Sequence, residues 1–388
     1  TFSALIFGKD TTGSWSLFGL NSTQTIGLLG VVMILVVTFM SSRGMDAIAK
    51  IGSIGGVLTI AVNVIFIVVS FVVLFANHFQ LAQPIHSASD FMTSPNPSFQ
   101  TTIAMISFVV YAIFAYGGME SLGSVTDNMD QPEKTFPRGL IIASVFTIGT
   151  YVLMIFMLGW SINYKSQMTS SSVNLGNVTY AVFNYLGIAM GNSLGWSHAA
   201  AASFGVIMTR TVALAQTAGF LGALFILMYS PIKAFIIGSD KRLWPAKLTE
   251  LNKAEMPANA MWVQAIIVCV IVFLVAFGGS AASRFYTILT DMANVSATAP
   301  YLFLVGAFPF FKKKHYEQSF EVFKNHTWTT ILVCFVEVIL LVGILFTFAE
   351  PLIEHDYETA FWTIAGPFFF ALVAFLFYQI AGKRNGVD

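Results

Sequence analysis

Charged residues are scarce in this 388-residue chain: Asp, Glu, Lys and Arg make up only 10% of it, against about 25% in soluble globular domains. The charges cancel, because 19 Lys and Arg face 19 Asp and Glu, so no net charge draws the chain to nucleic acid. Cysteine is nearly absent. Cys269 and Cys334 each lie alone in an apolar run, which excludes a disulfide framework and a thiolate metal site. With 56% hydrophobic residues, the composition excludes a soluble protein and predicts a lipid bilayer as the partner, with no cofactor.

Nine predominantly apolar runs are long enough to cross a bilayer as helices, which takes about 20 residues each. They cover residues 22–42, 51–76, 101–126, 137–160, 210–238, 259–279, 285–311, 327–350 and 359–382. Runs of this length favour helices over strands, and a helix satisfies its own backbone hydrogen bonds in lipid. The sequence therefore predicts an all-α, polytopic membrane helical bundle that forms a single transmembrane domain over residues 1–388.

Loop charges predict the orientation, because short cytoplasmic loops hold an excess of Lys and Arg. One set of alternate loops carries fourteen of the nineteen basic residues: Arg43, Lys50, Lys134, Arg138, Lys241, Arg242, Lys247, Lys253, Lys312, Lys313, Lys314, Lys324, Lys383 and Arg384. The opposite loops and span edges hold Lys9, Lys165, Arg210 and Arg284. We therefore expect an inner-membrane protein with a cytoplasmic C-terminus and an external N-terminus.

The first residues, TFSALIFGKD, read like the end of a helix and do not resemble an export signal. Together with the odd number of spans, they favour the absence of upstream spans from this sequence. A processed nine-span protein with an external terminus is the alternative.

The third run contains two adjacent glycines and an acid at membrane depth. Gly117 and Gly118 weaken a helix, and Glu120 follows where the chain should pass through lipid. Irregular backbone at this depth is tolerated only where it lines a cavity, and in transporters the freed backbone groups of such a break hold the solute. We predict a broken helix that binds a small polar solute. A glycine kink packed against a neighbouring helix is the alternative.

Two further spans carry acids. In the seventh run, Asp291, Asn294 and Thr298 follow the spacing i, i+3, i+7 and therefore share a helix face that cannot point to lipid. A water-lined pathway or hydrogen bonds between helices would explain this face. Glu337 in the eighth run has no opposite charge within a turn and stays unassigned, a protonated acid bonded to a neighbouring helix being its simplest explanation. Between the fourth and fifth runs, VTYAVFNYLGIAM is typical of an amphipathic helix on the membrane surface or over a vestibule.

These residues carry a family resemblance. The stretch from Phe114 through Gly118 and Glu120 to DNMDQPEKTFPRG resembles the sixth helix and following loop of the amino acid–polyamine–organocation superfamily, in its glutamate/GABA antiporter-like branch. The segment KAFIIGSDKRLWPAKLTELNKAEMPANAMW is similar to that family's loop after helix eight. The resemblance extends along essentially all 388 residues, and the helix-six element is its most specific part.

The resemblance implies a leucine-transporter-like fold of twelve helices, the first ten of which form two inverted repeats. The nine runs would then be helices four to twelve, and helices one to three would be lacking. The resemblance also implies site residues. It assigns substrate binding to Phe114, Ala115, Tyr116, Gly117 and Gly118, and gating or proton coupling to Glu120, Tyr229 and Tyr286, to which the polar face adds Asp291.

The function predicted in this way is secondary active amino acid transport, by an antiporter or a proton-coupled permease of glutamate/GABA type that works by alternating access. Such a protein performs no covalent chemistry, so we expect no enzyme activity, no metal and no cofactor. Its partners would be an amino acid substrate and the bilayer, and the sequence leaves a homodimer open. The alternative is a channel or a non-transporting membrane partner subunit, although no pore-loop signature is present.

Overall fold

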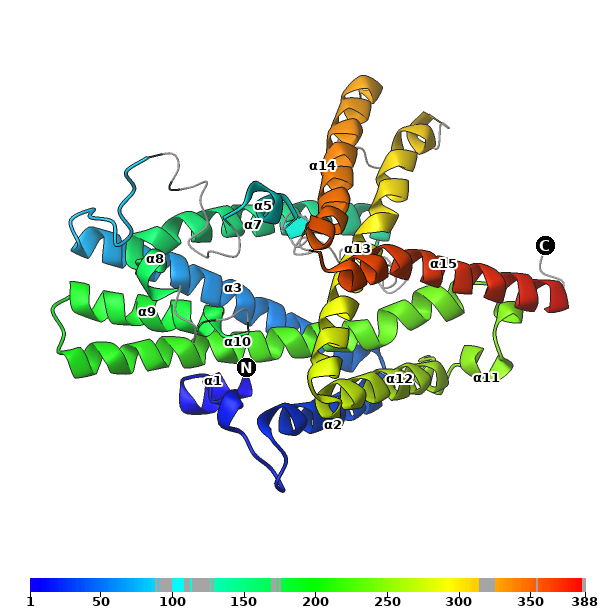
Figure 1. Cartoon of the computed structure of the whole chain (residues 1–388), viewed down its shortest axis with the longest axis horizontal. Coiled ribbons are helices and arrows are strands. Elements are labelled where there is room, and N and C mark those ends of the chain that lie inside the picture. Colours follow the sequence, from blue (N-terminus) through cyan, green and yellow to red (C-terminus); the bar gives the residue numbers. More distant parts are fainter. Residues whose placement is uncertain are drawn as a thin grey trace. The chain divides into compact units, whose positions relative to one another are not determined.

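The computed structural model describes residues 1–87, 90, 100–107, 112–113, 126, 129–168, 173, 176–313, 325–353 and 355–385. Within these residues the regular elements are helices, accompanied by one isolated bridge between Leu17 and Leu20 (Figure 1). Eight helices in this part of the chain have the length and apolar composition needed to cross a bilayer. The protein is therefore an all-α polytopic membrane protein, as its composition predicts.

Most of the third apolar run, 101–126, lies outside the described residues, and each of the other eight lies largely within one of the nine long helices of the described part of the chain. These long helices are α2 (Ser22–Ser41), α3 (Met45–Ala76), α7 (Pro132–Ser161), α9 (Val178–Ser193), α10 (His198–Ile232), α12 (Ala258–Phe277), α13 (Gly279–Lys313), α14 (His326–Ile353) and α15 (Tyr357–Asn385). The short ones are α1 (Phe2–Phe7), η1 (Thr12–Ser14), α5 (Thr102–Ser107), α8 (Tyr164–Gln167), η4 (Lys233–Ile237), η5 (Lys241–Leu243) and α11 (Ala246–Thr249). Helix α10 begins before the run predicted from residue 210, because the preceding HAAAASFG is rich in alanine, the strongest helix former.

Local sequence determines where several helices begin and end. Helix α1 ends at Gly8, which adopts the left-handed conformation with φ 70°. Asn21 caps α2: its side chain accepts a hydrogen bond from the Gln24 backbone, and the Gln24 side chain accepts one from the Asn21 backbone. This reciprocal pair satisfies two amides that the helix itself leaves free.

The chain divides into two compact units. The first consists of residues 1–96, 142–232 and 250–277. Its core lies where α3, α9 and α10 pack side by side (Figure 1). The rings of Phe66 from α3 and Phe183 from α9 meet there at a centroid distance of 5.5 Å, beside the buried Met208 and Val212 of α10. The amphipathic segment predicted after the fourth run is thus a packed helix, α9, whose apolar side faces this core.

Small residues set how closely α9 approaches α10. A β-carbon added to Gly187 would lie 2.8 Å from the Cα atom of Gly205, and one added to Gly191 would lie 2.6 Å from the Cβ atom of Ala201. Both distances are shorter than van der Waals contact, so the two backbones touch directly. Each helix places its two small residues four positions apart, which is the pattern of close helix pairs in membranes.

Glycines also bring the backbones of α3 and α10 into direct contact. A β-carbon on Gly55 would lie 2.7 Å from the carbonyl oxygen of Ala218, and one on Gly222 would lie 2.9 Å from the Cα atom of Gly52. Helix α10 is therefore held along two of its sides by neighbours that approach to backbone contact. This fixes its register against both α3 and α9.

The second unit consists of residues 97–141, 233–249 and 278–388. Helix α13 packs against α14 and α15, and the side chain of Met292 fills the space above Gly366 of α15. The segment after η4 lies on α15, where the rings of Trp244 and Phe377 are 4.9 Å apart. Trp244 also donates a hydrogen bond from Nε1 to Ser239 Oγ over 2.7 Å, so the indole has both an apolar and a polar partner.

Large apolar side chains cover the outer faces of the helices. Ile155 of α7 is 72% exposed, Phe368 of α15 is 72% exposed and Phe310 of α13 is 70% exposed. A monomeric protein in water rarely exposes contiguous apolar surface of this kind. In a bilayer the same side chains face hydrocarbon, and the free-energy cost of exposing them to water disappears.

Candidate functional site

The predicted substrate-binding segment, residues 114–118, and the predicted gate residue Glu120 lie outside the residues that the structure describes. Their roles stay predictions from the sequence. The described elements on either side are α5, which packs against α14, and α7, which begins at Pro132. A proline at the first position of a helix is well tolerated because its missing amide would have no partner there.

Tyr229, the predicted gating aromatic of α10, is a buried residue with 5% of its surface exposed. Ser230 beside it is equally buried, and the α-helical turns end at Ile232, directly after Pro231. The chain continues as the π-helical turn Lys233–Ile237, closed by a hydrogen bond from the Gly238 amide to the Lys233 carbonyl over 2.8 Å. Proline removes one helix hydrogen bond, and π-turns occur mostly at functional positions, so a backbone irregularity lies within two turns of Tyr229.

The polar face predicted on the seventh run is turned into the protein. Asn294 is 5% exposed and Thr298 is 1% exposed, and Thr298 Oγ1 donates to the Asn294 carbonyl over 2.8 Å. The Asn294 side-chain amide nitrogen is buried without a hydrogen-bond partner. For Tyr286 and Asp291 the structure describes the backbone of α13 but not the side chains, so their gating roles stay predictions. The burial of Asn294 and Thr298 places these two residues of the predicted face inside the protein.

A second candidate site is a pocket in the first unit that the sequence reasoning missed. We call it the N-terminal pocket. It is lined by Phe7, Gly8, Lys9, Asp10, Val173, Asn177, Tyr180, Ala181, Asn184, Tyr185, Val206 and Thr209, and its volume is about 400 Å³. Asn177 is the N-cap of helix α9, and the helix supplies Tyr180 and Asn184, four positions apart and therefore on one face. In the sequence, this spacing of polar residues in an otherwise apolar segment was the feature that could have indicated the pocket.

The chain segment after α1 closes one side of this pocket and is fixed by side chains. Arg210 of α10 donates from Nη2 to the Ile6 carbonyl over 3.0 Å, which satisfies a carbonyl at the end of α1. Asp10 Oδ1 accepts from the Thr12 amide over 3.0 Å and from Thr12 Oγ1 over 2.6 Å. Burial acts to raise the pKa of Asp10, but the hydrogen bonds from Thr12, the nearby positive charge of the N-terminus and the hydrogen bond from Asn177 together lower it. Asp10 is therefore ionised at neutral pH and held in place.

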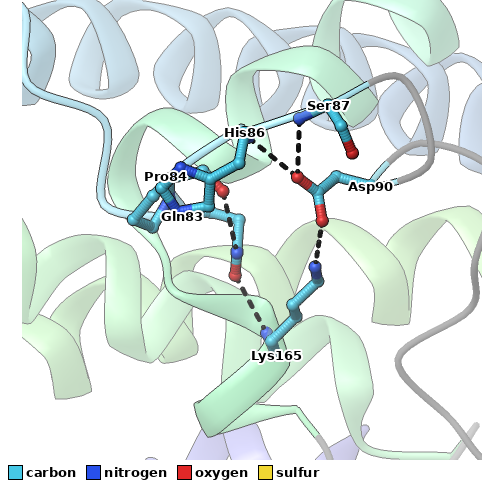
Figure 2. Close-up of polar contacts among 6 residues, drawn as sticks. All are labelled: Gln83, Pro84, His86, Ser87, Asp90 and Lys165. Carbon is cyan, nitrogen blue, oxygen red and sulfur yellow. Dashed lines mark hydrogen bonds and ion pairs between the residues drawn. The ribbon is translucent and has the colours of Figure 1, made fainter.

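A cluster of polar contacts joins the segment after α3 to helix α8 and the end of α7 (Figure 2). We call it the loop clasp. Asp90 accepts from Lys165 Nζ over 2.7 Å and from the backbone amides of His86, over 2.8 Å, and Ser87, over 3.2 Å. Gln83 Oε1 accepts from the Lys165 amide over 3.2 Å, and the Gln83 amide donates to the Gly159 carbonyl over 2.9 Å. The clasp ties the ends of two predicted spans on the face predicted to be external.

The hydrogen bond from Lys165, followed by those from the His86 and Ser87 amides, lowers the pKa of Asp90 well below the ordinary range of an aspartate. A carboxylate whose pKa is lowered by folding stabilises the folded form above its unfolded pKa of about 3.9. That contribution is lost only when the pH falls through the lowered value. The clasp should therefore stay closed throughout mildly acidic conditions.

Replacement of Lys165 by Met is expected to make the clasp sensitive to pH near 4. Without the ammonium, the pKa of Asp90 returns toward its ordinary value, and the carboxylate accepts less well from the His86 and Ser87 amides as it protonates. Hydrogen–deuterium exchange of these two amides, corrected for the intrinsic rate, should be about two- to fivefold faster at pH 4 in Lys165→Met than in the wild type. Lys50→Met, which changes an exposed lysine elsewhere, serves as the control. Equal rates in all three proteins would show that Lys165 does not hold the clasp.

Metal binding finds no support in the described part of the chain. No three His, Cys, Asp or Glu side chains there lie close enough together to hold an ion. Cys269 and Cys334 are both free thiols.

The comparison with known families agrees with this all-helical architecture. The family described as Amino acid permease matches residues 1–378. The chain belongs to the amino acid permease family of membrane transporters, within the superfamily that its motifs resemble.

The chain is also similar to individual membrane transporters. The chain is 43% identical to the "Inner membrane transporter YjeM" of Salmonella typhimurium, in an alignment covering 100% of this chain and 77% of the relative. It is 24% identical to the "Aspartate/glutamate permease AcaP" of Lactococcus lactis, covering 83% of this chain and 62% of the relative. It is 22% identical to a "Glutamate/gamma-aminobutyrate antiporter" of Lactococcus lactis, covering 94% and 69%. All three names describe membrane transporters.

Proposed function

We propose that this protein is a secondary active amino acid transporter of the inner membrane that works by alternating access, through exchange or proton coupling. The match of the amino acid permease family to residues 1–378 carries this proposal. The buried polar face of α13, with Asn294 and Thr298, adds support, because polar side chains inside a membrane bundle are expensive unless they serve a pathway or bond to one another.

The substrate class we infer is acidic amino acids and their decarboxylated products. Two relatives carry names that include aspartate, glutamate or gamma-aminobutyrate. The relative with 43% identity bears a name that states no substrate. Glutamate and GABA are therefore the first solutes to test, with leucine as an apolar comparison.

Within this mechanism, the backbone freed around Gly117 and Gly118 would hold the ends of the amino acid, with Phe114 covering it. Glu120 would be the titratable gate residue, and Tyr229, Tyr286 and Asp291 would line the route. Alternating access needs a hinge, and a broken helix supplies one without unfolding its neighbours.

Counterflow tests this proposal directly. Proteoliposomes of the full chain are loaded with unlabelled glutamate, GABA, aspartate or leucine, and uptake of the labelled solute is followed from outside. An exchanger accumulates label transiently above its equilibrium level, and only when the internal amino acid is present. A channel equilibrates without this overshoot. In vesicles without internal amino acid, uptake driven by an imposed pH gradient would instead indicate proton coupling. No protein-dependent uptake of any of the four solutes under either condition would contradict the proposal.

A further inference from the structure

The N-terminal pocket combines groups that together match one kind of solute. Its volume of about 400 Å³ lies in the range of about 300 to 1,000 Å³ typical of small-molecule sites. Consecutive residues on its edge carry opposite charges, Lys9 and Asp10, and both side chains are exposed to solvent. None of the lining residues belongs to the predicted break at residues 114–118.

Asp10 and Lys9 differ in how many hydrogen-bond and ion-pair partners they already have. A carboxylate offers about four acceptor positions, and Thr12 and Asn177 fill only part of those on Asp10. Among the described residues, none forms an ion pair or hydrogen bond with the Lys9 ammonium. The pocket edge therefore presents an anchored anion with acceptor capacity to spare, next to a cation that can still take an anionic partner.

The part of the pocket wall that α9 forms is rigid. Tyr180, Asn184 and Tyr185 project from α9, and α9 is fixed on α10 by the contact between Gly187 and Gly205. Tyr180 is 7% exposed, and its carbonyl accepts from Thr209 Oγ1 over 3.4 Å, which joins the pocket faces of the two helices. A site on packed helices keeps its geometry better than a site built from loops alone.

We propose that the N-terminal pocket binds a free α-amino acid as a zwitterion. The carboxylate of the solute pairs with Lys9 and its ammonium group with Asp10, while the two tyrosine rings contact its remaining atoms. This inference takes the class of solute from the proposed transport function, but the site consists of other residues. An aminophospholipid headgroup has similar end groups.

A cysteine-protection experiment tests the site itself. In a background in which Cys269 and Cys334 are replaced by Ala, Asn184→Cys places a reactive thiol in the pocket wall. Its labelling by a maleimide is measured in proteoliposomes of the full chain with and without glutamate, aspartate or leucine. We expect at least one of these amino acids to slow labelling. Adding Lys9→Gln should raise the concentration needed for protection about tenfold, the effect of one lost charged contact. Lys50→Gln should leave protection unchanged.

Asn192→Cys provides the matched control, because it is exposed on the same helix but does not line the pocket. Its labelling should not respond to amino acids. If counterflow succeeds but Cys at position 184 is never protected, the pocket proposal is wrong and the transport proposal stands. Protection without counterflow and without uptake driven by a pH gradient would leave the pocket site supported and contradict transport. Labelling that responds only to the phosphatidylethanolamine content of the vesicles would overturn the amino acid assignment.

Discussion

Replacement of Glu120 by Gln is expected to leave membrane insertion intact and to lower the rate of amino acid transport at least about tenfold, or to uncouple it from pH. The predicted role of Glu120 requires a carboxyl group that binds and releases a proton at membrane depth, which an amide cannot do. A tenfold change corresponds to about 1.4 kcal/mol in the rate-limiting barrier. The measurement is initial counterflow rate against pH, with the amount of inserted protein as the reference.

Glu337→Gln is the matched control, because it changes another membrane acid in the same way. One carboxyl oxygen of Glu337 is buried without a hydrogen-bond partner, and it faces Gly306 of α13, whose added β-carbon would lie 3.2 Å away. An amide of the same shape fits there, so transport by this variant should stay within about twofold of the wild type. Unchanged exchange by Glu120→Gln at every pH tested would remove Glu120 from the mechanism.

Gly205→Ala is expected to destabilise the folded protein by about 2 kcal/mol, although alanine is the better helix former. The added β-carbon would lie 2.8 Å from the Asn184 carbonyl oxygen. Because that atom is backbone, no side-chain rotation relieves the overlap, and α9 must move away from α10. The thermal midpoint of the purified protein in detergent should fall, and the protection of a thiol at position 184 should weaken with it.

Gly149→Ala separates the effect of helix propensity on stability from the effect of packing between helices. Gly149 lies inside α7, and a β-carbon there would meet nothing within 4 Å. Alanine at this position should leave the thermal midpoint unchanged or raise it, since replacement of a helix glycine by alanine gains about 1 kcal/mol where space allows. If both variants behaved alike, close approach of α9 and α10 would not be a source of stability.

The helices were the part of this structure that the sequence predicted most directly. An apolar run of twenty or more residues has few alternatives in lipid, because only a helix satisfies its backbone within the segment. The family resemblance also began from a short motif, residues 114–139, and the match over residues 1–378 confirmed the family. Helix ends were less certain, as the early start of α10 at His198 shows. There the alanine-rich sequence before residue 210 extends the helix beyond the apolar run from which it was predicted.

The contacts between helices were not predictable in the same way. The chain has 30 glycines, and the sequence does not indicate that Gly187 and Gly205 contact each other. The same holds for the N-terminal pocket, where Lys9 and Asp10 read as ordinary loop charges. Only the folded structure shows that Asn177 and Asn184 line the same pocket as these two charges. The spacing on α9 was visible in the sequence, but its neighbour was not.

The direct backbone contact at Gly187 and Gly205 has a consequence for genetic screens. In a saturation mutagenesis library scored by growth on a transported nutrient, both positions should reject nearly every substitution, although neither glycine lines the N-terminal pocket. Ranked by intolerance alone, they would be mistaken for recognition residues. Scoring the same library for surface abundance would separate them, because loss of assembly depletes the protein whereas loss of recognition does not.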